Sequence, residues 1–178
     1  LWVRGAQGTR VGVVGLGAGS LAAYATPGQK WVFYEIDPAV EEIARNPDFF
    51  TFLSECSSGV EVVLGDARLS LARGEASSYD LLILDAYSSD GIPVHLITRE
   101  ALQLYLDRLA PGGLLAFHVS NRYFDLEPVL AALANDLHLE NLVRRDRSIP
   151  PEELKKGKTH SVWILLTRST SDFGALAN

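Results

Sequence analysis

VGVVGLGAGS, residues 11–20, is the stretch that decides the fold of this chain. A short apolar run ends in three glycines at every second position, Gly15, Gly17 and Gly19, and residues 21–25 continue with Leu, Ala and Tyr. This order predicts a buried strand, a tight turn and the first turns of a helix. Glycine admits a positive φ and the close approach of a ligand, and the helix would present free N–H groups to it. A purely structural turn needs the same residues, so the loop alone identifies no ligand.

Length and composition describe one globular domain over residues 1–178. The chain is 47% hydrophobic and 21% charged, and a chain of this length buries about 70% of the surface that it exposes when unfolded. The net charge of −6 and the lack of a basic stripe argue against a nucleic-acid partner. The single cysteine, Cys56, cannot form an intrachain disulfide and shows no metal-ligand spacing with the four histidines. We therefore expect a cytoplasmic location and no metal.

The sequence offers no membrane span, because no apolar run approaches the ~20 residues that a spanning helix needs. It contains no methionine, not even at its first position, and it enters its first expected strand after only a few residues. We therefore expect that an upstream region is missing from this sequence.

Six more apolar runs follow the first, and helical segments separate most of them. The expected strands are residues 11–14, 31–36, 60–64, 79–85, 114–119, 139–145 and 161–166, and the expected helices include residues 38–45, 67–71 and 126–137. Asp37 suits the cap of the first of these helices, with Pro38 at its first position. The alternation predicts an α/β fold, Rossmann-like and doubly wound, with a mainly parallel seven-stranded sheet. Its ligand should bind outside the carboxyl ends of the strands, at the switch point beside the first strand.

Acidic residues follow three of the expected strands. Glu35 ends the second strand, Asp66 follows the third, and Asp85 ends the fourth. Three carboxylates at one edge of a sheet repel one another, which is a poor arrangement unless a ligand uses them. Each of them could instead cap a helix, and Asp66 is well placed to cap the helix that begins at Ala67.

The spacing of these acids favours an adenosine compound. Glu35 stands sixteen residues beyond Gly19, which suits a carboxylate that accepts both ribose hydroxyls. Ser20 stands where the nicotinamide-dinucleotide pattern has glycine. An acid after the third strand, Asp66, suits the exocyclic amine of an adenine. S-adenosylmethionine and its relatives, which have no pyrophosphate, fit these features.

Four motifs resemble those of class I S-adenosylmethionine-dependent methyltransferases, in the same order along the chain. They are GLGAG at residues 15–19, EID at 35–37, GDA at 65–67 and LAPGG at 109–113. Within that fold the chain most resembles the spermidine synthase (polyamine aminopropyltransferase) family, through YEIDP at 34–38 and DAYSSDGIP at 85–93. The resemblance covers about residues 10 to 168. It is closest to spermidine synthase-like domains that occur alone or fused behind a membrane transporter-like region.

The resemblance implies that S-adenosylmethionine or decarboxylated S-adenosylmethionine binds as the donor. In such a site Glu35 holds the ribose, and Asp66 with Ala67 meets the adenine. The implied donor-binding residues are Gly15, Leu16, Gly17, Ala18, Gly19, Glu35, Ile36, Asp66, Ala67 and Asp85.

The same resemblance implies a small-molecule amine acceptor, such as putrescine, flanked by two catalytic carboxylates, Asp85 and Asp90. An alkylamine is protonated near neutral pH, so an aspartate is expected to orient the ammonium and take its proton as the nitrogen attacks the carbon beside the sulfonium. Tyr87, Asn121 and Tyr123 follow expected strands that face the same crevice, and they are candidates to line the acceptor pocket. Packing or helix capping explains these three equally well, and Asp90 also suits an ordinary turn.

Three functions stay open at this point. The first is aminopropyl transfer to an amine, the second is a class I small-molecule methyltransferase, and the third is a non-catalytic domain that binds an adenosine ligand. Spermidine synthases usually carry aspartate where Ala18 stands, and their amino-terminal β-rich domain has no counterpart in these residues. A homodimer and a fused or upstream membrane region, which would make this the cytoplasmic domain of a membrane protein, also stay open. His118, inside the expected fifth strand, is interpreted as a core histidine.

Overall fold

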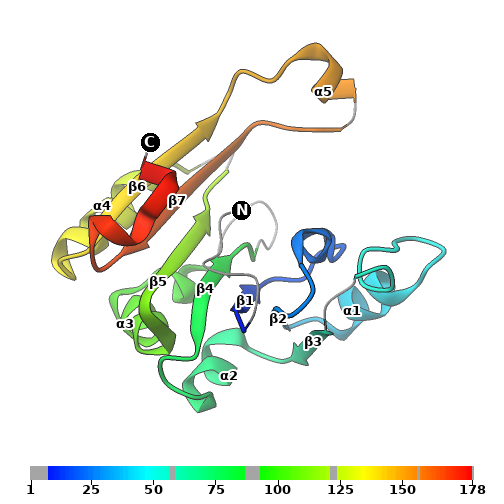
Figure 1. Ribbon diagram of the computed structural model, residues 1–178, viewed down its shortest axis with the longest axis horizontal. Helices are drawn as coiled ribbons and strands as arrows, with labels where there is room; N and C mark the ends of the chain where they lie inside the picture. The colour runs from blue at the N-terminus through cyan, green and yellow to red at the C-terminus, as the bar shows by residue number, and fades with distance from the viewer. Residues whose placement is uncertain (1–7, 57–58, 87–92, 121–123, 156, 178) are drawn as a thin grey trace.

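A single mixed sheet organises the chain. In the computed structural model, which describes residues 8–56, 59–86, 93–120, 124–155 and 157–177, seven strands lie in the order β3-β2-β1-β4-β5-β7-β6 (Figure 1). They are β1 Arg10–Val14, β2 Lys30–Glu35, β3 Gly59–Leu64, β4 Tyr79–Leu84, β5 Leu109–His118, β6 Glu140–Asp146 and β7 Ser161–Thr167. The pairs among β1 to β5 are parallel, and β7 runs antiparallel to both β5 and β6. The predicted doubly wound, mainly parallel seven-stranded fold is confirmed.

Helices cover both faces of this sheet. The α-helices are α1 Pro38–Arg45, α2 Ala67–Arg73, α3 Arg99–Arg108, α4 Glu127–Asp136 and α5 Pro151–Lys155, and the 3-10 helices are η1 Ser20–Tyr24, η2 Val94–Leu96 and η3 Thr170–Ala177. On one face α2, α3 and α4 pack through residues such as Leu71, Leu102 and Leu130. On the other face η1 and η3 pack through Ala22 and Phe173. Because side chains alternate along a strand, each buried strand supplies residues to both layers.

The first and last residues of the strands agree with those predicted from the sequence to within one residue, except in β5. This strand was expected to begin at Leu114, after a turn at residues 111–113, but it begins at Leu109. Tyr79 of β4 pairs with Leu109 while Leu81 pairs with Leu114, so the intervening residues form an irregularity inside the strand. Gly112, with φ of 74°, lies in this irregularity.

The segment after the glycine loop is helical, as expected, but its turns are those of a 3-10 helix. It forms a 3-10 helix of five residues, η1, which follows Gly19 and ends at Tyr24, before Ala25, whose backbone is extended. Thr26 precedes Pro27 and cannot easily remain helical, which helps to end the segment there. The expected α1 cap is confirmed, because the Asp37 side chain accepts a hydrogen bond from the Ala39 N–H at 2.9 Å.

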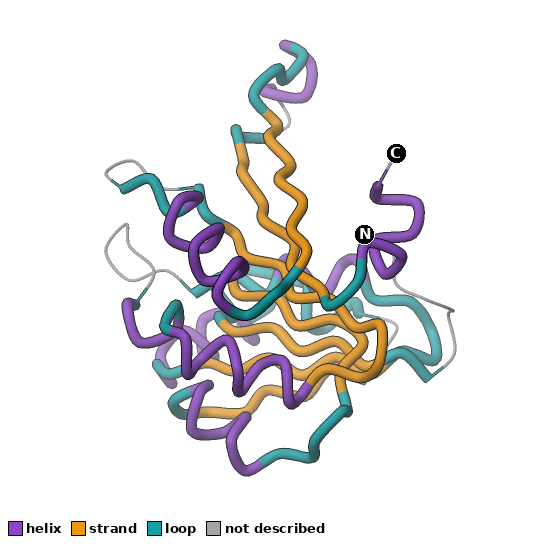
Figure 2. The backbone as a smooth tube through the Cα atoms, turned by 90° about the vertical axis from the view of Figure 1, so that its left-hand side faces the viewer, coloured by secondary structure: helices purple, strands orange, loops and turns teal. Residues whose placement is uncertain are grey.

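The other edge of the sheet is a long antiparallel hairpin. The tips of β6 and β7, with α5 between them, stand away from the rest of the sheet in Figure 2. Within the residues that the structure describes, no helix combines the length and the apolar character required to cross a bilayer.

Candidate functional site

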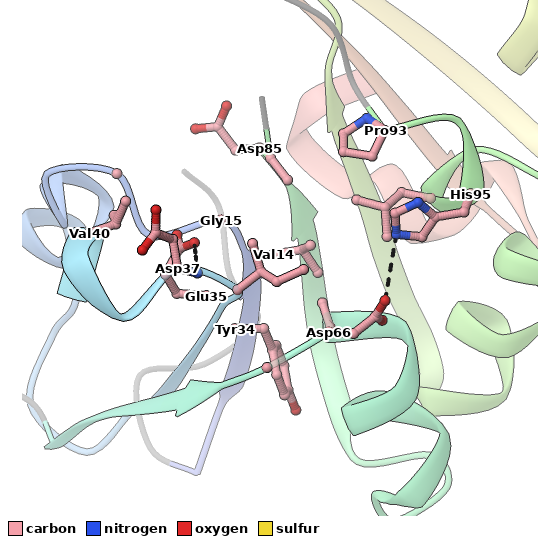
Figure 3. Close-up of a pocket in the computed structure, with 16 residues that line it drawn as sticks. Val14, Gly15, Tyr34, Glu35, Asp37, Val40, Asp66, Asp85, Pro93 and His95 are labelled. Carbon is pink, nitrogen blue, oxygen red and sulfur yellow. Dashed lines mark hydrogen bonds and ion pairs between the residues drawn. The ribbon is translucent and has the colours of Figure 1, made fainter. Parts of the chain in front are cut away.

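A pocket of about 400 Å³ lies at the carboxyl ends of the parallel strands (Figure 3). It is built from the ends of β1, β2 and β4, the start of α1, the β3–α2 connection and η2. This is the switch point beside β1, where doubly wound sheets bind their ligands, and its volume is in the range of small-molecule sites. The predicted residues that line it are Gly15, Gly17, Glu35, Ile36, Asp66, Ala67 and Asp85.

The three glycines of the loop differ in what their positions require. All have positive φ, at 98° for Gly15, 52° for Gly17 and 77° for Gly19. A Cβ on Gly15 would lie 2.5 Å from the carbonyl oxygen of Asp85 and 2.9 Å from Cα of Ala86, so the ends of β1 and β4 can meet only over glycine. Gly17 faces open space at the pocket, whereas a Cβ on Gly19 would meet the Leu53 side chain.

Three other predicted loop residues do not line the pocket. Leu16 is 5% exposed and packs in the core, so it serves the site through its backbone N–H instead. Ala18 is not among the residues around the cavity, and neither is Gly19.

Glu35 is held from both sides by backbone amides. Its Oε2 accepts a hydrogen bond from the Leu16 N–H at 3.0 Å, and its Oε1 accepts one from the Asp37 N–H at 3.0 Å. The side chain is 8% exposed and lines the pocket. Each carboxylate oxygen has a second acceptor site, so the carboxylate can receive two hydroxyls without giving up its backbone contacts.

Asp66 caps α2 and also lines the pocket. Its Oδ1 accepts a hydrogen bond from the Leu69 N–H at 3.0 Å, so the capping interpretation is correct. Its Oδ2 lies 3.7 Å from Nε2 of His95, a pocket residue from η2 that the sequence reading missed (Figure 3). Because cap and pocket use different oxygens, the two interpretations of Asp66 are compatible.

Asp85 is paired with a histidine. Its Oδ1 lies 2.7 Å from Nδ1 of His118, and the two side chains are 30% and 23% exposed. The His118 ring stacks on Trp163 of β7, with 4.6 Å between ring centroids and an interplanar angle of 18°. The sequence analysis interpreted His118 as a core histidine, and this was wrong. His118 is a half-buried neighbour of a pocket carboxylate.

Tyr34 contributes only its ring to the pocket wall. Its hydroxyl lies 2.5 Å from the hydroxyl of Tyr79, below the pocket. Burial first, and then the hydrogen bond with Tyr79, raise the pKa of Tyr34 well above the ordinary tyrosine value. Tyr34 is thus a neutral wall residue and not a proton donor for the site.

Four of the predicted site residues lie outside the described part of the chain. They are Asp90, Tyr87, Asn121 and Tyr123. In the described ranges, no group of three or more His, Cys, Asp or Glu residues is arranged to hold a metal ion.

Comparison with known proteins agrees with this architecture. No family model matches the chain. The polyamine aminopropyltransferase of Vibrio vulnificus (strain CMCP6) is 35% identical over 111 residues, which are 60% of this chain and 36% of that protein. A solved spermidine synthase in complex with the transition-state analogue AdoDATO superposes with a TM-score of 0.64 at 16% identity, over 92% of this chain and 57% of the other. The chain is thus similar in sequence to part of a polyamine aminopropyltransferase and in fold to a spermidine synthase.

The same fold is shared by methyltransferases. Human methyltransferase-like protein 13, solved in complex with SAH, superposes with a TM-score of 0.65 at 25% identity, over 95% of this chain and 78% of the other. The predicted resemblance to spermidine synthases within the class I methyltransferase fold is therefore confirmed. The chain spans about a third of the length of the curated relative that it matches.

Proposed function

We propose that this chain binds S-adenosylmethionine or its decarboxylated form in the pocket and transfers the aminopropyl group to an amine such as putrescine. The observation that carries the proposal is the convergence of Glu35, Asp66 and Asp85 around one 400 Å³ cavity at the switch point. The 35% sequence identity to a polyamine aminopropyltransferase over 111 residues supports the same reaction class.

The proposed donor contacts follow from atoms that remain available. Glu35 offers both oxygens to the ribose hydroxyls while the Leu16 and Asp37 amides hold it in place. Oδ2 of Asp66, which the cap does not use and which lies 3.7 Å from Nε2 of His95, is the oxygen proposed to meet the adenine amine. Gly17, which faces open space, lets the sugar or the sulfonium chain lie against the backbone.

The proposed transfer is a displacement at carbon. The neutral amine nitrogen forms a bond to the aminopropyl carbon next to the sulfonium, the carbon–sulfur bond breaks, and its electron pair stays on sulfur as a thioether. Before the attack, Asp85 orients the ammonium through its charge and accepts one of its protons, which leaves the neutral amine. The product of the attack is a secondary ammonium ion. Because the sulfonium is already a good leaving group, alignment of the two reactants supplies much of the remaining acceleration.

A second candidate is methyl transfer to a small molecule. It is favoured by Ala18, which stands where spermidine synthases usually carry the aspartate that meets the donor's amine. The likeness to methyltransferase-like protein 13, over 78% of that chain, supports it as well. In this case the carboxyl-bearing donor is the preferred one.

Calorimetry with S-adenosylmethionine, decarboxylated S-adenosylmethionine and methylthioadenosine separates these functions. Preference for the decarboxylated donor, with putrescine turnover that is lost in Asp85→Asn, supports aminopropyl transfer. Preference for S-adenosylmethionine supports methyl transfer, and binding without turnover of any amine indicates a non-catalytic domain. Binding of none of the three ligands would refute both enzymatic proposals.

A further inference from the structure

Asp85 stands at one end of a row of three side chains across three strands. Leu84 of β4 pairs with Phe117 of β5, so the residues that follow, Asp85 and His118, are neighbours across the sheet. His118 in turn pairs with Trp163 of β7 in the antiparallel register. Asp85 lines the pocket, whereas His118 does not. In the described part of the chain, His118 is therefore linked to the pocket through its contact with Asp85.

The contact with His118 assigns different tasks to the two oxygens of Asp85. Oδ1 lies 2.7 Å from Nδ1 of His118, and an ionised carboxylate only accepts hydrogen bonds, so Nδ1 carries the proton when Asp85 is ionised. Oδ2 is then the oxygen left for an ammonium ion. Since the terminal torsion of aspartate has a broad, two-fold preference, this hydrogen bond is what holds Oδ2 in one orientation.

Trp163 holds the imidazole ring of His118, the hydrogen-bond donor to Asp85, in place. The terminal torsion of histidine is also broad, and an imidazole that moved freely would hold Asp85 poorly. Stacking on Trp163, at 4.6 Å and 18°, keeps the ring in one plane. The His118 side chain is 23% exposed, so burial alone does not immobilise it.

We propose that His118 is a positioning residue for Asp85, held by Trp163, and that it aims Oδ2 at the amine acceptor during transfer. This inference rests on the proposed transferase function. The proposal gives His118 a role in transfer, although His118 belongs to neither the glycine loop nor the carboxylate motifs of the sequence.

A matched pair of substitutions separates the hydrogen bond from the stacking. His118→Asn retains an N–H donor close to the position of Nδ1 but loses the stacked ring. His118→Phe retains a ring against Trp163 but loses the donor. Both variants leave the pocket residues Glu35 and Asp66 in place, so the affinity for methylthioadenosine, measured by calorimetry, should be unchanged.

The two variants should differ in turnover. We expect kcat for amine transfer to fall about 10- to 100-fold in His118→Phe and to stay within about 3-fold of the wild type in His118→Asn. The KM for the donor should change little in both. Equal losses in the two variants, or full activity in His118→Phe, would overturn the positioning role.

A spectroscopic readout keeps this test separate from the proposed function. The Nδ1–H proton of His118 should give a downfield resonance in the wild-type NMR spectrum, and Asp85→Ala should abolish it. Absence of that resonance overturns the inference, whether or not the chain is shown to transfer a group. If the resonance is present but no adenosine ligand binds, the proposed function fails and the positioning role in transfer fails with it.

Discussion

Glu35 and Leu16 are joined across the glycine loop, because Oε2 of Glu35 accepts a hydrogen bond from the Leu16 N–H at 3.0 Å. This bond fixes the loop to the end of β2 and orients the carboxylate at the pocket. The carboxylate therefore serves both the loop conformation and the proposed ribose contact, and its substitution should affect ligand binding more than its small volume change suggests.

Glu35→Gln should weaken the binding of every adenosine ligand about 10- to 100-fold. The amide has only one acceptor oxygen, so its NH₂ group must face one of the two backbone N–H donors that Glu35 now satisfies. Calorimetry with methylthioadenosine measures the effect, and Glu42→Gln, at an exposed position of α1, is the matched control. Unchanged affinity in Glu35→Gln would remove the ribose assignment.

Asp66→Asn and Asp66→Ala should separate the cap from the pocket. Asn caps helices as well as Asp, so Asp66→Asn should leave stability nearly unchanged, whereas Asp66→Ala should lose about 1 kcal/mol. Asparagine that accepts from the Leu69 N–H with its oxygen turns its NH₂ group toward the pocket, where the adenine amine is also a donor. Both variants should therefore bind adenosine ligands weakly. Wild-type affinity in Asp66→Asn would show that Oδ2 does not meet the adenine.

Gly15→Ala should destabilise the fold more than Gly17→Ala. A Cβ at position 15 meets the backbone of Asp85 and Ala86 at a φ of 98°, and we expect a loss of about 2–4 kcal/mol in the free energy of unfolding. At position 17 the space is open, so the loss should be about 1 kcal/mol, from the positive φ alone. Urea denaturation compares the two. Equal losses would contradict the packing argument at Gly15.

Alkaline pH should destabilise the fold through its buried tyrosines. Burial is the main cause that raises the pKa of both Tyr34 and Tyr105 in the folded state. Their stabilising contribution is fully present below the ordinary tyrosine pKa of about 10 and is lost as pH rises toward the higher folded value. Thermal melts from pH 8 to about 11.5 should show this decline, less steeply in Tyr34→Phe. Replacement of the exposed Tyr24 by Phe is the control and should follow the wild-type profile.

The sequence predicted the sheet and its acidic edge because both depend on local pattern. Apolar runs mark the parallel strands, and the carboxyl ends of such strands share one edge, so Glu35, Asp66 and Asp85 could be brought together before their contacts were known. The strand order and the antiparallel placement of β7 add to that picture without moving these residues. The three carboxylates that line the pocket could therefore be predicted from the sequence.

The partners of these carboxylates were not accessible in the same way. His118 meets Asp85 only in the register that β4 and β5 adopt after the irregularity between Leu109 and Leu114. A shift of one residue would turn His118 to the opposite face, and no local pattern encodes that register. His95 was missed because it comes from η2, which follows a long connection and has no strand periodicity of its own.

The contact of Gly15 with the Asp85 backbone gives the proposed donor and acceptor sites a common wall. Under the proposed function, a shift of the loop on donor binding should also move the strand end that carries Asp85, because a Cβ on Gly15 would already lie 2.5 Å from the Asp85 carbonyl oxygen. Under the proposed function the two substrates are thus thermodynamically linked. Whatever factor the donor contributes to acceptor affinity, the acceptor must return to the donor, and binding should be cooperative in both directions.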